Sequence, residues 1–178
     1  TSPCGWLWSS VSLSMDNGKL RILQSCFSHS WGGLELQALE ISSRLHARGH
    51  EVWVACIPES RLHREAARHQ LRLLPLNVRG YVHPIVIARI SKFVRTSRIN
   101  IIHSHLSRDL ATLSMAIRFS GMSIPLVLSK RVGSYLSKKD LFHRLTYAKV
   151  STVLAISSVI HRNVLQTTPM APEQVITL

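Results

Sequence analysis

Short apolar runs alternate with longer amphipathic stretches along most of this chain of 178 residues. The apolar runs, each with the length of a buried strand, lie at 20–26, 51–57, 71–76, 99–104, 125–129, 152–156 and 174–178. The stretches between them have helical character and lie at 34–48, 60–69, 85–97, 108–119, 139–150 and 157–167. Strands that alternate with helices predict an α/β fold with a doubly wound parallel sheet of about six or seven strands.

The first strand, loop and helix are the most informative unit of this pattern. In the helix 34–48, one apolar stripe is formed by Leu34, Ala38, Ile41 and Leu45. Gly49 follows directly, where a left-handed residue often ends a helix, and the strand 51–57 comes next. This order predicts a right-handed parallel crossover. Ligands on such sheets bind at the carboxyl ends of the strands, near the switch in strand order.

The two ends of the chain depart from the pattern. Residues 1–14 carry no charge and no periodicity, and they lack the basic start and the small-residue cleavage site of a secretory signal. Met15 opens a convincing natural start. We therefore expect 1–14 to be a non-native leader or a disordered tail, with Trp6 and Trp8 outside the core, and 15–178 to be the folded domain. The chain stops just after the last apolar run without a closing helix, so we expect a truncation.

The charge of the chain is strongly basic. Lysine and arginine number 22 against 9 acidic residues, and no acidic residue lies between Glu65 and Asp109. Such a balance favours anionic partners: nucleic acid, membrane phosphate or a phosphorylated ligand. No apolar run approaches the roughly 20 residues of a membrane-spanning helix. The cysteines show no CxxC spacing, and no histidines lie beside them at zinc-ligand spacing. We therefore expect a reduced, cytoplasmic protein without a metal site.

The helix 85–97 carries part of this basic charge on one side. Arg89 and Lys92 point away from an apolar stripe formed by Val86, Ile90, Phe93 and Val94. A face of this kind suits peripheral contact with an anionic membrane, where each cation contributes about 1 kcal/mol at low salt. A solvated helix face explains the same pattern equally well.

The loop between the first strand and the first helix contains the first candidate site. Gly32 and Gly33 let the backbone approach a ligand closely, and the helix N-terminus behind them offers free N–H groups that suit phosphate. A purely structural turn is an equal alternative, because the loop is neither a GxGxxG fingerprint nor a Walker loop. Glu35 either serves the site or caps the loop.

Four segments together resemble family-4 glycosyltransferases. WGGLELQALEISSRLHARGHEVWVA resembles the opening of these proteins, with Gly32, Gly33 and Glu35 in the loop and Gly49 and His50 in the turn before the second strand. The other three segments are INIIHSHLSRD, VSTVLAISSVIHRNVL and PEQVITL, which resemble the fourth strand, a late strand entering a serine-capped helix, and the approach to the inter-domain linker. The resemblance covers residues 19–178 in order.

This resemblance implies the N-terminal half of a GT-B fold, in which two Rossmann-like domains face a cleft. The N-terminal domain shapes the acceptor site, and the donor-binding domain is absent from these residues. The implied reaction is retaining transfer of a sugar from a nucleotide-sugar to a hydroxyl acceptor, such as a lipopolysaccharide, another cell-envelope glycan or a lipid-linked glycan. The nucleotide-sugar is a co-substrate and no cofactor is expected. We expect the isolated half to be inactive and the protein to be cytoplasmic, with peripheral contact at the inner face of the membrane.

Two further pairs of residues complete the candidate cleft. We expect His103 and His105 to lie on opposite faces of the fourth strand, with His105, nearer the loop, facing the cleft. Relatives often carry a histidine after the fifth strand, whereas this chain has Lys130 and Arg131. These cations suit a donor diphosphate or a phosphorylated acceptor, and a solvated basic pair is the alternative. No catalytic residue is assigned.

A different class of function also fits the charge. An isolated basic Rossmann-like domain could bind phosphate or nucleic acid without catalysis. The basic third of the chain has no RNP motif, no basic repeat and no interleaved aromatic residues. We therefore expect no nucleic-acid partner and keep this alternative second.

Overall fold

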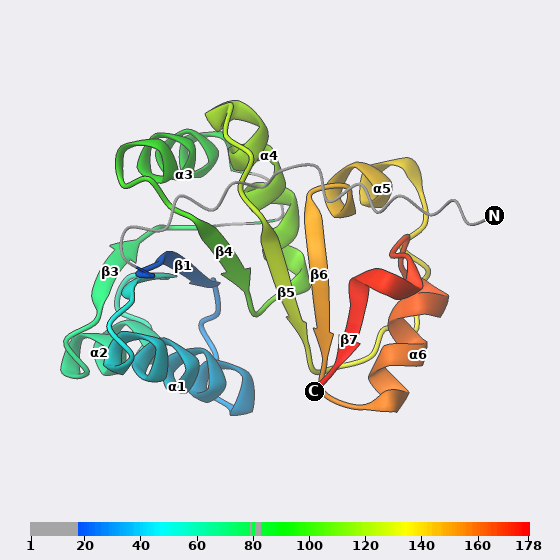
Figure 1. Cartoon of the computed structure of the whole chain (residues 1–178), viewed down its shortest axis with the longest axis horizontal. Coiled ribbons are helices and arrows are strands. Elements are labelled where there is room, and N and C mark those ends of the chain that lie inside the picture. Colours follow the sequence, from blue (N-terminus) through cyan, green and yellow to red (C-terminus); the bar gives the residue numbers. More distant parts are fainter. Residues whose placement is uncertain (1–17, 79, 81–82) are drawn as a thin grey trace.

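The computed structural model describes residues 18–78, 80 and 83–178, so the leader 1–14 with Trp6 and Trp8 lies outside the described residues. A single sheet of seven parallel strands runs through the described part, in the order β3-β2-β1-β4-β5-β6-β7 (Figure 1). The strands are β1 Arg21–Cys26, β2 Glu51–Cys56, β3 Arg72–Pro75, β4 Ile101–Ser104, β5 Leu126–Lys130, β6 Val150–Ala155 and β7 Val175–Thr177. The predicted parallel α/β sheet is confirmed.

Helices connect successive strands and cover both faces of the sheet. They are α1 Gly33–Ala47, α2 Arg61–Arg68, α3 Pro84–Thr96, α4 Leu110–Ser120, α5 Leu141–Tyr147 and α6 Ser158–Thr167, with short 3₁₀ turns η1 Ser107–Asp109 and η2 Pro172–Gln174. Figure 1 shows α1 and α2 on one side of the sheet and α3 and α4 on the other. Within the described residues, no helix has the length and apolar content needed to cross a membrane.

Strand β2 shows how alternation divides the core between the two faces. Val54 and Cys56 pack with α1 and α2, whereas Ala55 packs with α3 and α4. Successive side chains of a strand point to opposite faces, so a strand covered on both sides is apolar throughout. The strand order reverses between β1 and β4, where Leu23 is paired with Ile102. This reversal creates the switch point of a doubly wound sheet.

Several boundaries differ from those that the sequence predicts. Helix α5 is shorter than 139–150 at both ends. It starts at Leu141 because the Asp140 side chain accepts a hydrogen bond from the backbone N–H of His143 (3.1 Å) and so caps the helix, and it ends at Tyr147. Strand β6 begins at Val150 instead of residue 152. Gln174 belongs to η2 and not to the last strand. These shifts of one to three residues leave the order of elements unchanged.

Helix α1 is rotated relative to the stripe that the sequence predicts. Its buried residues are Glu35, Ala38, Leu39 and Ser42, while the expected Leu34, Ile41 and Leu45 are only half-buried. Glu35 points inward because its carboxylate turns back to the loop. This inward position of Glu35 explains the rotation of the helix. Gly49 has φ +89°, which confirms the predicted left-handed end of the helix.

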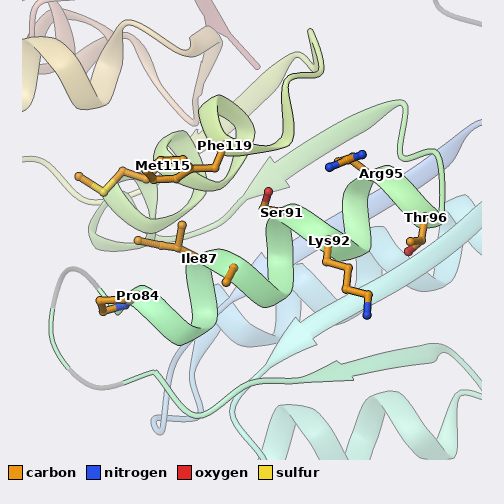
Figure 2. A pocket seen from close by; sticks show the side chains of 9 residues that line it. Pro84, Ile87, Ser91, Lys92, Arg95, Thr96, Met115 and Phe119 are labelled. Atoms are coloured by element: carbon orange, nitrogen blue, oxygen red, sulfur yellow. The ribbon is translucent and has the colours of Figure 1, made fainter.

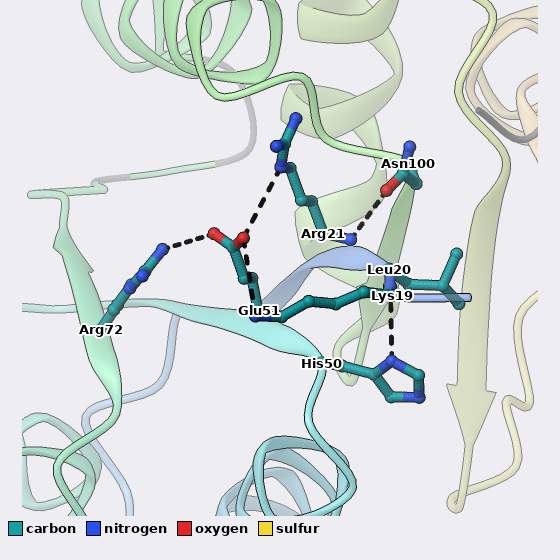
Figure 3. Close-up of polar contacts among 7 residues, drawn as sticks. All are labelled: Lys19, Leu20, Arg21, His50, Glu51, Arg72 and Asn100. Atoms are coloured by element: carbon teal, nitrogen blue, oxygen red, sulfur yellow. Dashed lines mark hydrogen bonds and ion pairs between the residues drawn. The ribbon is translucent and has the colours of Figure 1, made fainter. Parts of the chain in front are cut away.

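The amino ends of β1 and β2 are held together by a charged cluster on the edge of the sheet opposite the candidate site (Figure 3). Glu51 pairs with Arg72 (2.6 Å), Arg21 (3.9 Å) and Lys19 (4.0 Å). The backbone N–H of Arg21 also donates to the Asn100 side chain (2.7 Å), which ties β1 to the start of β4. Much of the positive charge at this edge is therefore paired within the fold and stabilises it.

Candidate functional site

The glycine loop joins the carboxyl end of β1 to α1. Gly32 precedes the helix in extended backbone (φ −159°), which any residue adopts, and its N–H donates to the Glu35 carboxylate (2.9 Å). Glu35 therefore caps the loop, as one of the two sequence alternatives predicted. A Cβ added to Gly33 would meet nothing within 4 Å. The backbone conformation at Gly32 does not require a glycine. The missing side chain at Gly33 leaves open space beside the first N–H groups of α1.

Asp109, in η1 after β4, fixes the start of this loop. Its carboxylate accepts a hydrogen bond from the backbone N–H of Phe27 (3.0 Å), and the hydroxyl of Ser25 lies at 3.5 Å. Arg108 donates to the carbonyl of the same Phe27. Asp109 is 3% exposed, and burial raises its pKa to about 7, against the lowering effects of the Phe27 bond and of Arg108. From the sequence we expect Asp109 in the first turn of the next helix, where the helix dipole stabilises a carboxylate, and the structure adds its contacts with the loop.

His103 and His105 lie on the same face of the β4 end, so the prediction that they face opposite sides is wrong. Residues i and i+2 of a strand share a face, and the two rings lie 4.4 Å apart between centroids. His103 shares a hydrogen bond with the Ser129 hydroxyl and His105 with the Gln24 side chain, both at 2.8 Å. Burial lowers the pKa of His103 to about 4 and that of His105 well below its ordinary value, which favours the neutral form of both rings.

Three buried polar atoms in this region lack a hydrogen-bond partner among the described residues. They are His105 Nδ1, Gln24 Nε2 and Arg131 Nε. The guanidinium of Arg131 lies close enough to His105 to contribute to the lowering of its pKa. Buried polar atoms are normally satisfied, so a cluster of unsatisfied ones at strand ends is typical of a ligand site. His105 is 2% exposed, which places its ring beneath the surface of that site.

Lys130 is buried at the end of β5. Its side chain is 9% exposed, and its Nζ donates to the Ser107 hydroxyl (3.1 Å). Burial and the nearby Lys138 lower the pKa of Lys130 to about 8. Lys130 and Arg131 are not a fully solvated basic pair, because Lys130 is buried and Arg131 is half-buried.

The sheet brings most of the predicted residues to one edge. Strands β1, β4 and β5 are neighbours, and the glycine loop, His105 and the Lys130–Arg131 pair all lie at their carboxyl ends. Among the described residues, no hydrogen bond or ion pair links Gly32, Gly33 or Glu35 to the two cations. The edge therefore holds both the first N–H groups of α1 and the side chains of Lys130 and Arg131, and groups of both kinds can bind an anion. Asp109, Gln24 and Ser107 join the site without any signal in the local sequence.

The sequence matches the model of one protein family. The family is described as Glycosyltransferase Family 4, and the match covers residues 31–178. No curated protein matches the chain in sequence.

Solved structures share the fold at low sequence identity. A glycosyltransferase from Rickettsia africae ESF-5 superposes with a TM-score of 0.72 at 17% identity, over 89% of this chain and 42% of that one. Anabaena HepE in complex with UDP-glucose superposes with a TM-score of 0.69 at 16% identity, over 89% of this chain and 43% of that one. Acinetobacter baumannii MurG superposes with a TM-score of 0.61 at 11% identity, over 88% of this chain and 45% of that one. This chain thus spans less than half of each of these proteins, and at such identities the likeness shows the fold alone.

Proposed function

Because this chain belongs to glycosyltransferase family 4, we propose that it forms the acceptor-side half of a retaining GT-B enzyme. The enzyme transfers a sugar from a nucleotide-sugar to a hydroxyl group of a cell-envelope glycan, with lipopolysaccharide-type and lipid-linked glycans as the acceptor class. The observation that carries the proposal is the set of groups at the switch point, where the glycine loop, the unsatisfied polar atoms and the Lys130–Arg131 pair lie towards the carboxyl ends of neighbouring strands.

The proposed donor contact uses the chemistry of this edge. The N-terminus of α1 offers N–H groups and the positive end of its dipole, and the missing side chain at Gly33 lets phosphate oxygens come close. Lys130 and Arg131 add positive charge on the other side, where they stabilise the diphosphate as it leaves. The nucleotide-sugar is the co-substrate, and these steps involve no cofactor. The complex of HepE with UDP-glucose supports a donor of this chemical type.

Calorimetry with UDP-glucose tests this proposal on the chain itself. In a GT-B arrangement most donor contacts lie on the second domain, so we expect a dissociation constant no tighter than about millimolar, or roughly 4 kcal/mol. Gly33→Val should weaken this binding at least fivefold without loss of stability, because its Cβ enters open space. The matched control is Leu36→Val, on the exposed side of α1, which should leave binding unchanged. Micromolar binding, or equal effects of the two substitutions, would contradict the proposal.

Peripheral membrane contact is the second part of the proposal, and a groove between α3 and α4 supports it. The groove has a volume of about 990 Å³ and is apolar at Ile87, Met115 and Phe119, with Lys92 and Arg95 at its side (Figure 2). An apolar groove beside cations matches the two parts of an anionic amphiphile. Contact through this groove would bring the enzyme to a lipid-linked acceptor.

Liposome sedimentation measures this contact. We expect binding to require anionic lipid, to fall as salt rises, and to weaken at least tenfold in the double variant Arg89→Glu/Lys92→Glu, because each cation contributes about 1 kcal/mol. The control Arg48→Glu/Arg162→Glu makes the same change in net charge on exposed residues of other elements and should bind like the wild type. Equal binding to neutral and anionic liposomes would show that the basic helix face is only solvated.

A further inference from the structure

A second, smaller cavity adjoins the candidate site. It has a volume of about 370 Å³ and lies between η1 with the start of α4 on one side and α5 with the segment before it on the other. Ser107 and Arg108 line it from the first side, and Lys138, Phe142 and Tyr147 from the second. Arg108 also donates to the carbonyl of Phe27, so the cavity is next to the start of the glycine loop.

Lys138 lines this cavity and Lys130 adjoins it, and neither lysine has a counterion among the described residues. The Nζ of Lys130 donates to Ser107, a lining residue, and Lys138 lies close enough to help lower the pKa of Lys130. Among the described residues neither lysine forms an ion pair. The nearby carboxylates are engaged elsewhere: Asp140 pairs with His143, and Asp109 accepts from Phe27 beside Arg108. Two like charges that are withdrawn from water repel each other and lose solvation, a cost that a bound anion removes.

The Tyr147 hydroxyl is an independent sign of a missing ligand. Tyr147 lines the cavity and is 4% exposed, and its hydroxyl forms no hydrogen bond of normal geometry, although the Ser107 side chain is near enough to oppose the rise that burial causes in its pKa. A buried hydroxyl without a partner costs free energy comparable to a lost hydrogen bond. Phe142, which is 44% exposed, adds an aromatic surface at the same cavity.

We propose that this cavity binds the anionic group of a sugar, a phosphate or a carboxylate, and so selects an acidic sugar as the acceptor. The anion contacts Lys138, the Tyr147 hydroxyl donates to it, and the sugar ring packs on Phe142. The assignment of this ligand as the acceptor rests on the proposed function, whereas its binding chemistry rests on the cavity alone.

NMR titrations of the 178-residue chain without any donor test the cavity directly. The probes are glucose 6-phosphate, glucuronate, glucose and inorganic phosphate. We expect one or both acidic sugars to shift amide signals of 107–111 and 136–147, with at least tenfold tighter binding than glucose or inorganic phosphate. If only one acidic sugar binds, it identifies the anion as phosphate or carboxylate. Binding of glucose or inorganic phosphate as tight as that of both acidic sugars would overturn the proposal.

Two variants separate binding from folding. Lys138→Ala should weaken the acidic sugar at least tenfold, whereas Lys139→Ala, the exposed neighbour outside the cavity lining, should change it less than twofold. Tyr147→Phe should weaken it about fivefold without lowering Tm, because the hydroxyl forms no hydrogen bond of normal geometry within the described protein. Equal effects of the two lysine variants, or no effect of Tyr147→Phe, would overturn the proposal. Because no donor is present, failure of sugar transfer cannot produce either result.

Discussion

Between pH 4 and pH 8, the free energy of unfolding of Asp109→Asn is expected to rise by about 4 kcal/mol relative to that of the wild type. Burial raises the Asp109 pKa from an ordinary 3.8 to about 7. Between these values the unfolded chain has released the proton while the folded chain keeps it. Stability from this group is therefore present at pH 4 and lost as pH rises towards 7. The asparagine oxygen still accepts the Phe27 N–H and does not ionise.

Urea unfolding of both proteins at several pH values measures this difference. The comparison is needed because the neutral buried His103 and His105 act in the opposite sense: their pKa values are lowered, so their contribution is lost as pH falls below about 6.5. Asp140→Asn is the matched control, since the pKa of this exposed carboxyl is lowered and its contribution is lost on acidification. A difference between Asp109→Asn and wild type that does not change with pH would refute the raised pKa.

Phe27→Ala is expected to cost about 3–5 kcal/mol, the largest effect on stability among single changes at the site. Phe27 is 1% exposed and packs in the core cluster on the α3–α4 side of the sheet, directly where β1 ends and the glycine loop begins. Its N–H and carbonyl are held by Asp109 and Arg108. Loss of the ring leaves a cavity and also frees the loop, so UDP-glucose binding should fall together with stability.

Denaturant unfolding compares this variant with Phe119→Ala. Phe119 is the same residue type but is 73% exposed at the groove on α4, so its removal should change stability by no more than about 0.5 kcal/mol. Similar losses from the two substitutions would show that Phe27 does not anchor the loop.

The sequence predicts the order of elements well because each apolar run reports local burial. A strand covered on both faces is apolar throughout, as at Val54–Cys56, and Gly49 marks a helix end through a backbone conformation that glycine adopts easily. The exact ends were less predictable. Helix α5 starts where Asp140 caps it, and a capping bond depends on side-chain geometry that periodicity does not contain.

The site was predictable as a place and less so as a set of contacts. Gly33 and Lys130 lie at the expected edge, because loops that follow parallel strands meet there. The bond from Phe27 to Asp109 spans 82 positions in sequence and depends on the pairing of β1 with β4. The same register pairs Gln24 with His103 and lets the Gln24 side chain reach the ring of His105. The shared face of His103 and His105, in contrast, follows from the period of a strand and was available from the sequence.

Residue-resolved NMR titration with UDP-glucose is the most direct test that the carboxyl edge of β1, β4 and β5 is the donor side of the site. We expect fast-exchange shifts at 27–35, 103–109 and 129–131, with a dissociation constant of about millimolar or weaker. The amides around Glu51, at the opposite edge of the sheet, should not move. Shifts that gather around Glu51, an absence of shifts at saturating ligand, or saturation at micromolar ligand would contradict the account.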